Sequence, residues 1–182
     1  MKELIKFLEY VSKLKLTVRT GWKILEIEKG ETIGSHSFGV IFLSWLLAKK
    51  KKIDVDKTIK MALVHDLIEG ITGDIAYTEE KYKIKDYLEE KALPELMRIL
   101  PNELKNDIRT LIQDLIEEKT EEAITVREAD RLDTIFQAHL YKKINSGKLS
   151  HFIEYAEEVC KKGYSRDILD YIKSLQGNKK SK

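Results

Sequence analysis

The segment ALVHDLIEGITGDI, residues 62–75, decides how the fold and the chemistry of this chain are interpreted. It opens with apolar residues in a helical pattern and then places His65 and Asp66 side by side. Burying such a polar pair at the end of an apolar helix is costly unless something compensates for the lost hydration. Gly70 and Gly73 follow at once and are expected to break the helix. The segment therefore predicts an apolar helix that ends on a polar pair with a structural or a functional partner.

Helical periodicity continues on both sides of this segment. Two prolines and nine glycines among 182 residues leave few breaks, and no long stretch alternates apolar and polar residues as a strand does. We therefore predict an all-α fold of six or seven helices. The expected helices are one through Leu4–Leu14, one from His36 to the Lys49–Lys52 cluster, and others at about 57–68, 78–100, 102–118, 120–144 and 149–175.

Several details of these helices are also predicted. Residues 18–35 lose the helical pattern and carry three glycines, so we expect a long loop of the kind that often serves function. The helix from His36 is apolar nearly all round and is expected to be buried. Asp54 or Asp56 is expected to cap the helix at 57–68. Breaks are expected at Pro94 and near Gly163.

Composition excludes several classes of function. The net charge is +2 (33 basic minus 31 acidic residues), so no global field favours nucleic acid or an anionic membrane as partner. A single cysteine, Cys160, rules out an internal disulfide framework and suits a reducing compartment. No apolar run approaches the roughly 20 residues that span a bilayer. We expect one cytoplasmic domain over residues 1–182, with a disordered, Lys-rich tail at 176–182.

Four residues could together form a metal site. His36 opens one apolar helix, His65 and Asp66 close another, and Asp130 lies within a third. Packed helices can bring such groups to one point, and two imidazoles with two carboxylates suit a divalent transition ion. Plainer explanations exist for each residue alone. His36 could be a helix cap, the His65-Asp66 pair a structural ion pair, and Asp130 a surface charge.

The order of these residues resembles the H…HD…D signature of the HD-domain metal-dependent phosphohydrolases, and the flanking sequence resembles their 5′-deoxynucleotidase branch. The likeness extends from about residue 5 to about residue 145. One position departs from the family: Ser35 precedes the first histidine, where an acidic residue is common. The matching segments are Leu14–Lys15 with Arg19–Trp22, Glu31–Ser37, Ala62–Ile75, Ile99–Leu104, and Glu122 with Val126–Leu132 and Gln137–Ala138.

The resemblance implies an activity and a set of site residues. It implies that one divalent cation (Mn, Co, Mg, Zn, Ni or Fe) is held by His36, His65, Asp66 and Asp130. It further implies hydrolysis of a nucleoside 5′-monophosphate to nucleoside and phosphate, with a preference for deoxynucleotides, and it leaves a homodimer open. The other implied roles are Glu69 and Asp74 as catalytic acids or bases, Arg19 as the phosphate-binding residue, and Trp22 against the sugar.

Two features of the sequence bear on these roles directly. Glu69 follows Asp66 by three residues and so returns to nearly the same helix face, beside the expected ion. Trp22 is a bulky residue three positions after Arg19, so it could exclude a 2′-hydroxyl once the phosphate is fixed.

Three other hypotheses compete with this one. An HD phosphohydrolase for a cyclic nucleotide, a nucleoside triphosphate or a guanosine polyphosphate would need the same metal ligands. A non-catalytic metal- or nucleotide-binding module would not need Glu69 and Asp74. A purely structural helical protein would leave the polar pair at residues 65–66 unexplained.

Overall fold

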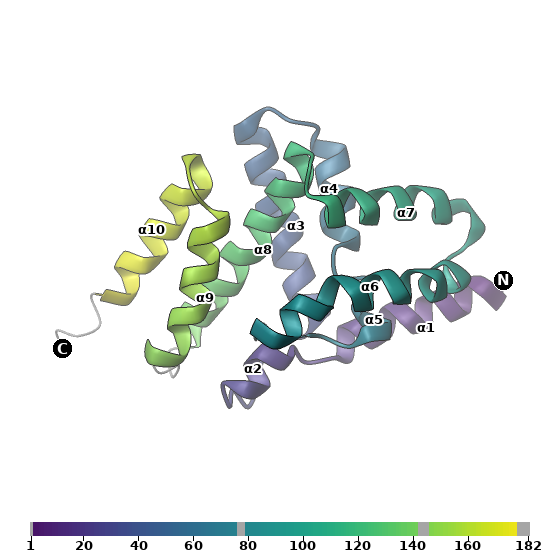
Figure 1. Ribbon diagram of the computed structural model, residues 1–182, viewed down its shortest axis with the longest axis horizontal. Helices are drawn as coiled ribbons and strands as arrows, with labels where there is room; N and C mark the ends of the chain where they lie inside the picture. Colours follow the sequence, from purple (N-terminus) through teal and green to yellow (C-terminus); the bar gives the residue numbers. More distant parts are fainter. Residues whose placement is uncertain (1, 76–78, 142–145, 178–182) are drawn as a thin grey trace.

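The all-α prediction is confirmed by a computed structural model that describes residues 2–75, 79–141 and 146–177 (Figure 1). Over these residues the chain forms ten helices and no strand, apart from one isolated antiparallel bridge between Val18 and Thr32. The helices are α1 (Lys2–Leu16), α2 (Thr20–Ile24), α3 (Ile33–Lys51), α4 (Val55–Val64), α5 (Glu69–Thr72), α6 (Glu79–Ile99), α7 (Asn102–Glu117), α8 (Glu121–Leu140), α9 (Ser146–Val159) and α10 (Gly163–Gly177).

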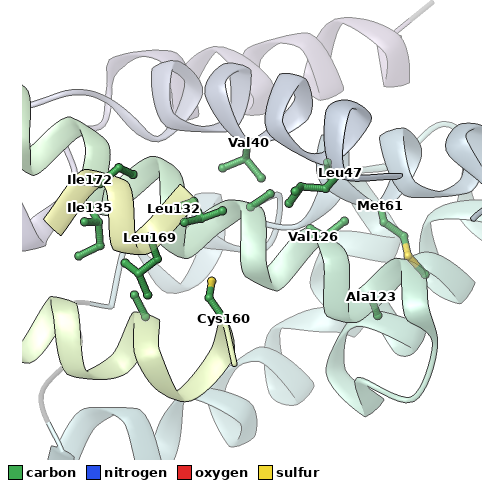
Figure 2. Close-up of a cluster of buried hydrophobic side chains, with 13 residues drawn as sticks. Val40, Leu47, Met61, Ala123, Val126, Leu132, Ile135, Cys160, Leu169 and Ile172 are labelled. Carbon is green, nitrogen blue, oxygen red and sulfur yellow. The ribbon is translucent and has the colours of Figure 1, made fainter. Parts of the chain in front are cut away.

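The main hydrophobic core lies around α8, which packs against α3, α4, α9 and α10. Figure 2 shows side chains from these helices meeting at one place, with Val40 and Leu47 from α3 and Leu132 from α8. All three are fully buried. Because α3 and α8 make the most extensive contact in the molecule, any group on one of them is held firmly relative to the other.

A second core lies where α1 packs against α5 and α6 (Figure 1). Its buried members include Leu14 of α1 and Leu96 of α6. The Tyr10 hydroxyl donates a hydrogen bond of 2.5 Å to the carbonyl oxygen of Leu67, which ties α1 to the turn after α4. A Cβ on Gly70 would lie 2.6 Å from the Tyr10 ring, so only glycine fits there. This core therefore fixes the turn at residues 65–68, where the His65-Asp66 pair lies.

Polar caps set the beginnings of three helices. The Thr32 side chain accepts a hydrogen bond from the backbone N–H of Ser35, and Asp54 accepts one from Lys57. Thr120 caps α8 in the same way. Such caps satisfy backbone donors that the first helical turn leaves free. The prediction of a cap at Asp54 or Asp56 is confirmed for Asp54.

The segment at residues 18–35 and the end of α4 differ from the prediction. The expected loop contains α2, and α3 begins at Ile33 rather than at His36. The helix expected over 57–68 ends at Val64, a turn covers residues 65–68, and α5 restarts at Glu69. Short helices of four or five residues are set by tertiary contacts and have too few turns to show a periodic pattern.

The two predicted interruptions have different outcomes. Pro94 lies inside α6, so the predicted break there is wrong. Proline removes one hydrogen bond from a helix, but Leu96 and Leu100 beyond it are buried in the second core and hold the helix together. The break near Gly163 is confirmed, since α10 starts at Gly163 with a positive φ of 71°.

The ends of the chain bear on two further predictions. Helix α10 runs to Gly177, two residues into the expected Lys-rich tail, and the rest of that tail lies outside the described residues. Among the helices that the structure describes, none combines the length and the apolar character needed to cross a bilayer.

Cys160 yields a test of the main core. Its side chain is fully buried, and burial together with Glu128 raises the pKa of its thiol to about 12. We expect a thiol reagent at mildly alkaline pH to label no cysteine in the folded protein and one after denaturation. Because the folded pKa exceeds the ordinary 9.0, the neutral thiol contributes stability below pH 9.0 that is lost as pH rises towards 12. Rapid labelling of the native protein would contradict this placement.

Candidate metal centre

The four residues predicted as metal ligands converge on one point between three parts of the fold. His36 lies in the first turn of α3, His65 and Asp66 lie in the turn after α4, and Asp130 lies in the middle of α8. The His36 Nε2 atom is 3.0 Å from Asp130 Oδ1 and 3.8 Å from Asp66 Oδ2. The His65 Nε2 atom is 3.2 Å from Asp66 Oδ2. The structure therefore groups His36, His65 and Asp66, and Asp130 contacts this group through His36.

The hydrogen bonding of His65 shows which of its nitrogens faces the site. Its Nδ1 lies 2.7 Å from the carbonyl oxygen of Ala62. A carbonyl oxygen can only accept a hydrogen bond, so Nδ1 carries the proton and donates it. The Nε2 atom is then left with a lone pair, and it is buried with no hydrogen-bond partner among the described residues. This is the state in which imidazole binds a metal ion.

His36 is held in a similar way by a carboxylate. The side chain is fully buried, and its Nδ1 lies 2.8 Å from Asp133 Oδ2. Burial and the nearby Arg19 lower the pKa of His36, but its hydrogen bonds to Asp130 and Asp133 outweigh them and raise it to about 9. Without an ion, a proton on His36 thus offsets part of the negative charge of the site.

The charges of the site fit a bound divalent cation. Burial alone would raise the pKa of Asp66, yet the imidazoles of His65 and His36, when they carry a proton instead of binding an ion, hold it well below its ordinary range. Burial likewise acts against ionisation of Asp130, but Arg131 and His36 lower its pKa. Because two ionised carboxylates lie beside two imidazole nitrogens in a buried space, binding of a cation there is favoured. The mixed nitrogen and oxygen donor set suits a borderline divalent ion.

Asp133 is a member of the site that sequence reasoning missed. It lies on α8, one turn after Asp130, and its carboxylate reaches His36 on α3. Gly39 makes this approach possible, because a Cβ there would lie 2.1 Å from Asp133 Oδ1. Ser35 occupies the position where the family commonly has an acidic residue. It is exposed and hydrogen-bonded to Thr32. The carboxylate that orients His36 therefore comes from α8, and the spacing of three residues after Asp130 was its only signal.

Arg19 reaches the site from the segment before α2. Its Nη1 atom donates hydrogen bonds to Glu31 Oε1 at 3.2 Å and to Thr134 Oγ1 at 3.1 Å. Its Nη2 atom is 4.0 Å from Asp130 Oδ1. Burial opposes its charge, but Asp130 and Asp66 outweigh that and raise the pKa of Arg19 further. The guanidinium is thus a fixed positive charge beside the ligands, and Glu31 and Thr134 are partners that the sequence did not reveal.

Trp22 occupies a position different from the one expected. The side chain is 1% exposed, and its ring is stacked on Phe152 and meets Tyr141 edge-on. Its Nε1 donates a hydrogen bond of 3.0 Å to Glu31 Oε1, the oxygen that also accepts from Arg19. This burial argues against direct contact between Trp22 and a sugar. The indole instead helps to hold the carboxylate that orients Arg19.

Glu69 and Asp74 lie on either side of the glycine turn. Glu69 is buried in the first turn of α5, just after the His65-Asp66 turn. The Asp74 carboxylate accepts a hydrogen bond from the backbone N–H of Thr20, and the Thr20 hydroxyl donates to the Asp74 carbonyl oxygen at 2.9 Å. Asp74 therefore connects the segment after α5 to the residue next to Arg19.

A cavity of about 410 Å³ opens onto the ligands. His65, Asp66 and Asp130 form part of its wall, and α7 and α8 supply apolar side chains such as Ile112 and Val126. Arg131 also lines it, and its guanidinium lies 4.1 Å from the centre of the Tyr155 ring. Its volume lies within the usual range for small-molecule pockets.

Comparison with known proteins identifies the family. The model of the HD domain matches residues 11–170, which is most of the chain. The chain belongs to the HD-domain family.

Individual relatives match most of the chain. The chain is 34% identical to the 5′-deoxynucleotidase HDDC2 of Xenopus laevis over 154 residues, covering 83% of this chain and 76% of that protein. It is 35% identical to the 5′-deoxynucleotidase HDDC2 of Dictyostelium discoideum, covering 79% and 80%. Among solved structures, the PH0347 protein of Pyrococcus horikoshii OT3 is 34% identical with a TM-score of 0.76, over 94% of this chain and 99% of that one.

Asp133 provides a test of the metal centre that does not depend on activity. We expect Asp133→Asn to weaken binding of Mn²⁺ or Co²⁺ by about 10–100-fold, because His36 loses the carboxylate that orients it. Titration calorimetry of the metal-free chain measures this directly. Asp170→Asn, which changes an exposed aspartate paired with Arg166, is the matched control and should bind as the wild type does. Unchanged affinity in Asp133→Asn would show that His36 needs no such support.

Proposed function

We propose that this protein hydrolyses deoxynucleoside 5′-monophosphates to nucleoside and phosphate with the help of one divalent cation. The observation that carries the proposal is the convergence of His36, His65, Asp66 and Asp130 beside the Arg19 guanidinium. A site with metal ligands and a fixed cation suits phosphoryl chemistry, in which negative charge must be bound and stabilised. The 5′-deoxynucleotidase names of two relatives at 34% and 35% identity support the choice of substrate.

The four ligands would hold the ion through two nitrogens and two carboxylate groups. When bound there, the cation supplies Lewis acidity, which polarises a phosphoryl oxygen and lowers the pKa of a bound water. The protein contributes orientation: the Ala62 carbonyl and the Asp133 carboxylate fix the two imidazole rings, so that each Nε2 faces the site.

Arg19 is the group that we assign to the substrate phosphate. A guanidinium stays charged under all working conditions and offers several N–H donors in one plane. Its Nη1 is occupied by Glu31 and Thr134, which fixes the plane of the group. Trp22 acts indirectly in this scheme, by donating to the same Glu31 oxygen.

Glu69 and Asp74 are assigned to proton transfer and to placement of the leaving nucleoside. Glu69 is buried and follows the ligand turn, so it can orient the attacking water or take its proton. Asp74 bonds to the residue after Arg19, on the path from the phosphate to the sugar. The leaving alkoxide oxygen must gain a proton, and one of these two carboxyl groups would supply it.

A nucleotide panel tests the substrate class. We expect phosphate release from deoxynucleoside 5′-monophosphates in the presence of a divalent ion, faster than from the ribonucleotides. Cyclic nucleotides, nucleoside triphosphates and guanosine polyphosphates belong in the same panel. Preferred turnover of any of these would assign the site to another HD phosphohydrolase activity. Ion binding without turnover on any phosphate ester would favour a non-catalytic binding module.

Two substitutions separate metal binding from catalysis. We expect Asp130→Ala to lose both the ion and the activity, since it removes a ligand. Glu69→Gln should keep the ion, and with it the rise in melting temperature that ion binding produces, yet lose roughly 10²–10⁴-fold in kcat. Metal analysis and steady-state kinetics on the same samples distinguish the two. If Glu69→Gln also loses the ion, Glu69 supports the metal site instead of transferring a proton.

A further inference from the structure

Arg131 brings a second guanidinium to the candidate metal centre. It follows Asp130 on α8, and both residues line the cavity that opens onto the candidate ligands. Its Nη1 atom is 3.2 Å from Asp130 Oδ2, whereas the other oxygen of that carboxylate, Oδ1, is 4.0 Å from Arg19 Nη2. The two guanidinium groups therefore approach different oxygens of the same candidate ligand, one from α8 and one from the segment before α2.

An aromatic ring of α9 holds Arg131 in this position. The guanidinium carbon of Arg131 lies over the Tyr155 ring, 4.1 Å from its centre, which is a favourable cation–π contact. The ring is itself fixed, because Tyr155 is 7% exposed and its hydroxyl accepts a hydrogen bond of 2.8 Å from Arg127 Nη2. Arg127 also forms an ion pair with Glu118. Arg131 is thus held at the cavity wall by two contacts, one with Asp130 and one with Tyr155.

The charges around the site favour a further cation for a bound phosphate. Two ionised carboxylates, Asp66 and Asp130, would offset the two positive charges of a divalent ion. The Arg19 guanidinium is already paired with Glu31 at 3.2 Å. A phosphate monoester brings a further charge of about −1.5 to −2 at neutral pH. In a largely buried site such a charge is costly unless it is paired, and Arg131 supplies positive charge at the cavity wall.

We propose that Arg131 is a second oxyanion-binding residue, which contacts a phosphate group at the ion from the cavity while Arg19 contacts it from the segment before α2. The ligand class, a phosphate group, rests on the proposed function, and the residue assigned to it is additional. A guanidinium has five N–H donors in one plane, so it can keep its contact with Asp130 and donate to phosphate oxygens as well. Tyr155 is then a positioning residue, which acts through Arg131.

Binding of inorganic phosphate to the Mn²⁺-loaded chain tests the proposal without any turnover. Titration calorimetry measures Mn²⁺ binding and then phosphate binding on the same samples. We expect Arg131→Met to bind Mn²⁺ no more weakly than the wild type, because the change removes a positive charge beside the ligands. Phosphate should bind about 10–100-fold more weakly, as is usual when a hydrogen bond to a charged group is lost. Arg131→Lys keeps the charge without the planar donors and should show a smaller loss.

Two further comparisons separate the role of Arg131 from a general effect of charge or packing. Arg109→Met is the matched control, because Arg109 is exposed on α7 and lies outside the described wall of the cavity. It should bind phosphate as the wild type does. Tyr155→Leu removes the ring against which Arg131 lies and should weaken phosphate binding while Mn²⁺ binding is kept. Tyr155→Phe retains the ring and should lose less phosphate affinity than Tyr155→Leu.

Circular dichroism checks folding, and Arg131→Lys decides the outcome if Arg131→Met loses helix content. The proposal is overturned by a wild type that binds no phosphate, by unchanged phosphate affinity in the Arg131 variants, or by an equal loss in Arg109→Met. Weaker Mn²⁺ binding in Arg131→Met would also overturn it, and would show that Arg131 only supports Asp130. These outcomes are distinct from those of the nucleotide panel, because phosphate binding through Arg131 can be present or absent whichever phosphate ester the protein hydrolyses.

Discussion

The rest of the structure depends on one unfavourable arrangement: two ionised carboxylates and two imidazole side chains lie 3.0–3.8 Å from their neighbours in a largely buried place. His36 is fully buried and Asp66 nearly so, and the Nε2 atom of His36 lies 3.0 Å from an Asp130 oxygen. Such a cluster repels itself until a cation or protons enter it. The apolar packing of the helices that carry these groups offsets the unfavourable free energy of the cluster. The same packing holds the groups in the positions that an ion would need.

The contact between α3 and α8 has a central part in this arrangement. It carries His36 and Asp130, and it also carries Asp133, which fixes the ring of His36 from the far side. Gly39 allows the two helices to approach closely enough for that bond. One helix pair thus supplies two candidate ligands and the residue that orients one of them, because all three depend on the same packed interface.

A second set of contacts links Arg19 to the C-terminal part of the chain. Arg19 is oriented by Glu31, Glu31 accepts a bond from Trp22, and Trp22 stacks on Phe152 of α9. The backbone N–H of Glu31 also donates to the Tyr141 hydroxyl at 2.6 Å. Changes in α9 can therefore reach the Arg19 guanidinium through packing.

The sequence by itself determined the all-α class and most long helices, because periodicity is a local property. It also supplied, through the H…HD…D order, the prediction of four metal ligands. Only the tertiary structure showed that Asp133 orients His36 across 97 residues of chain, that Trp22 is buried, and that one face of α3 is exposed. A pattern of apolar residues predicts that a helix face is buried, but it does not identify the residues that cover that face. The covering residues are decided by the packing of helices distant in sequence, which is why Asp133 and the other neighbours of the candidate ligands could not be predicted.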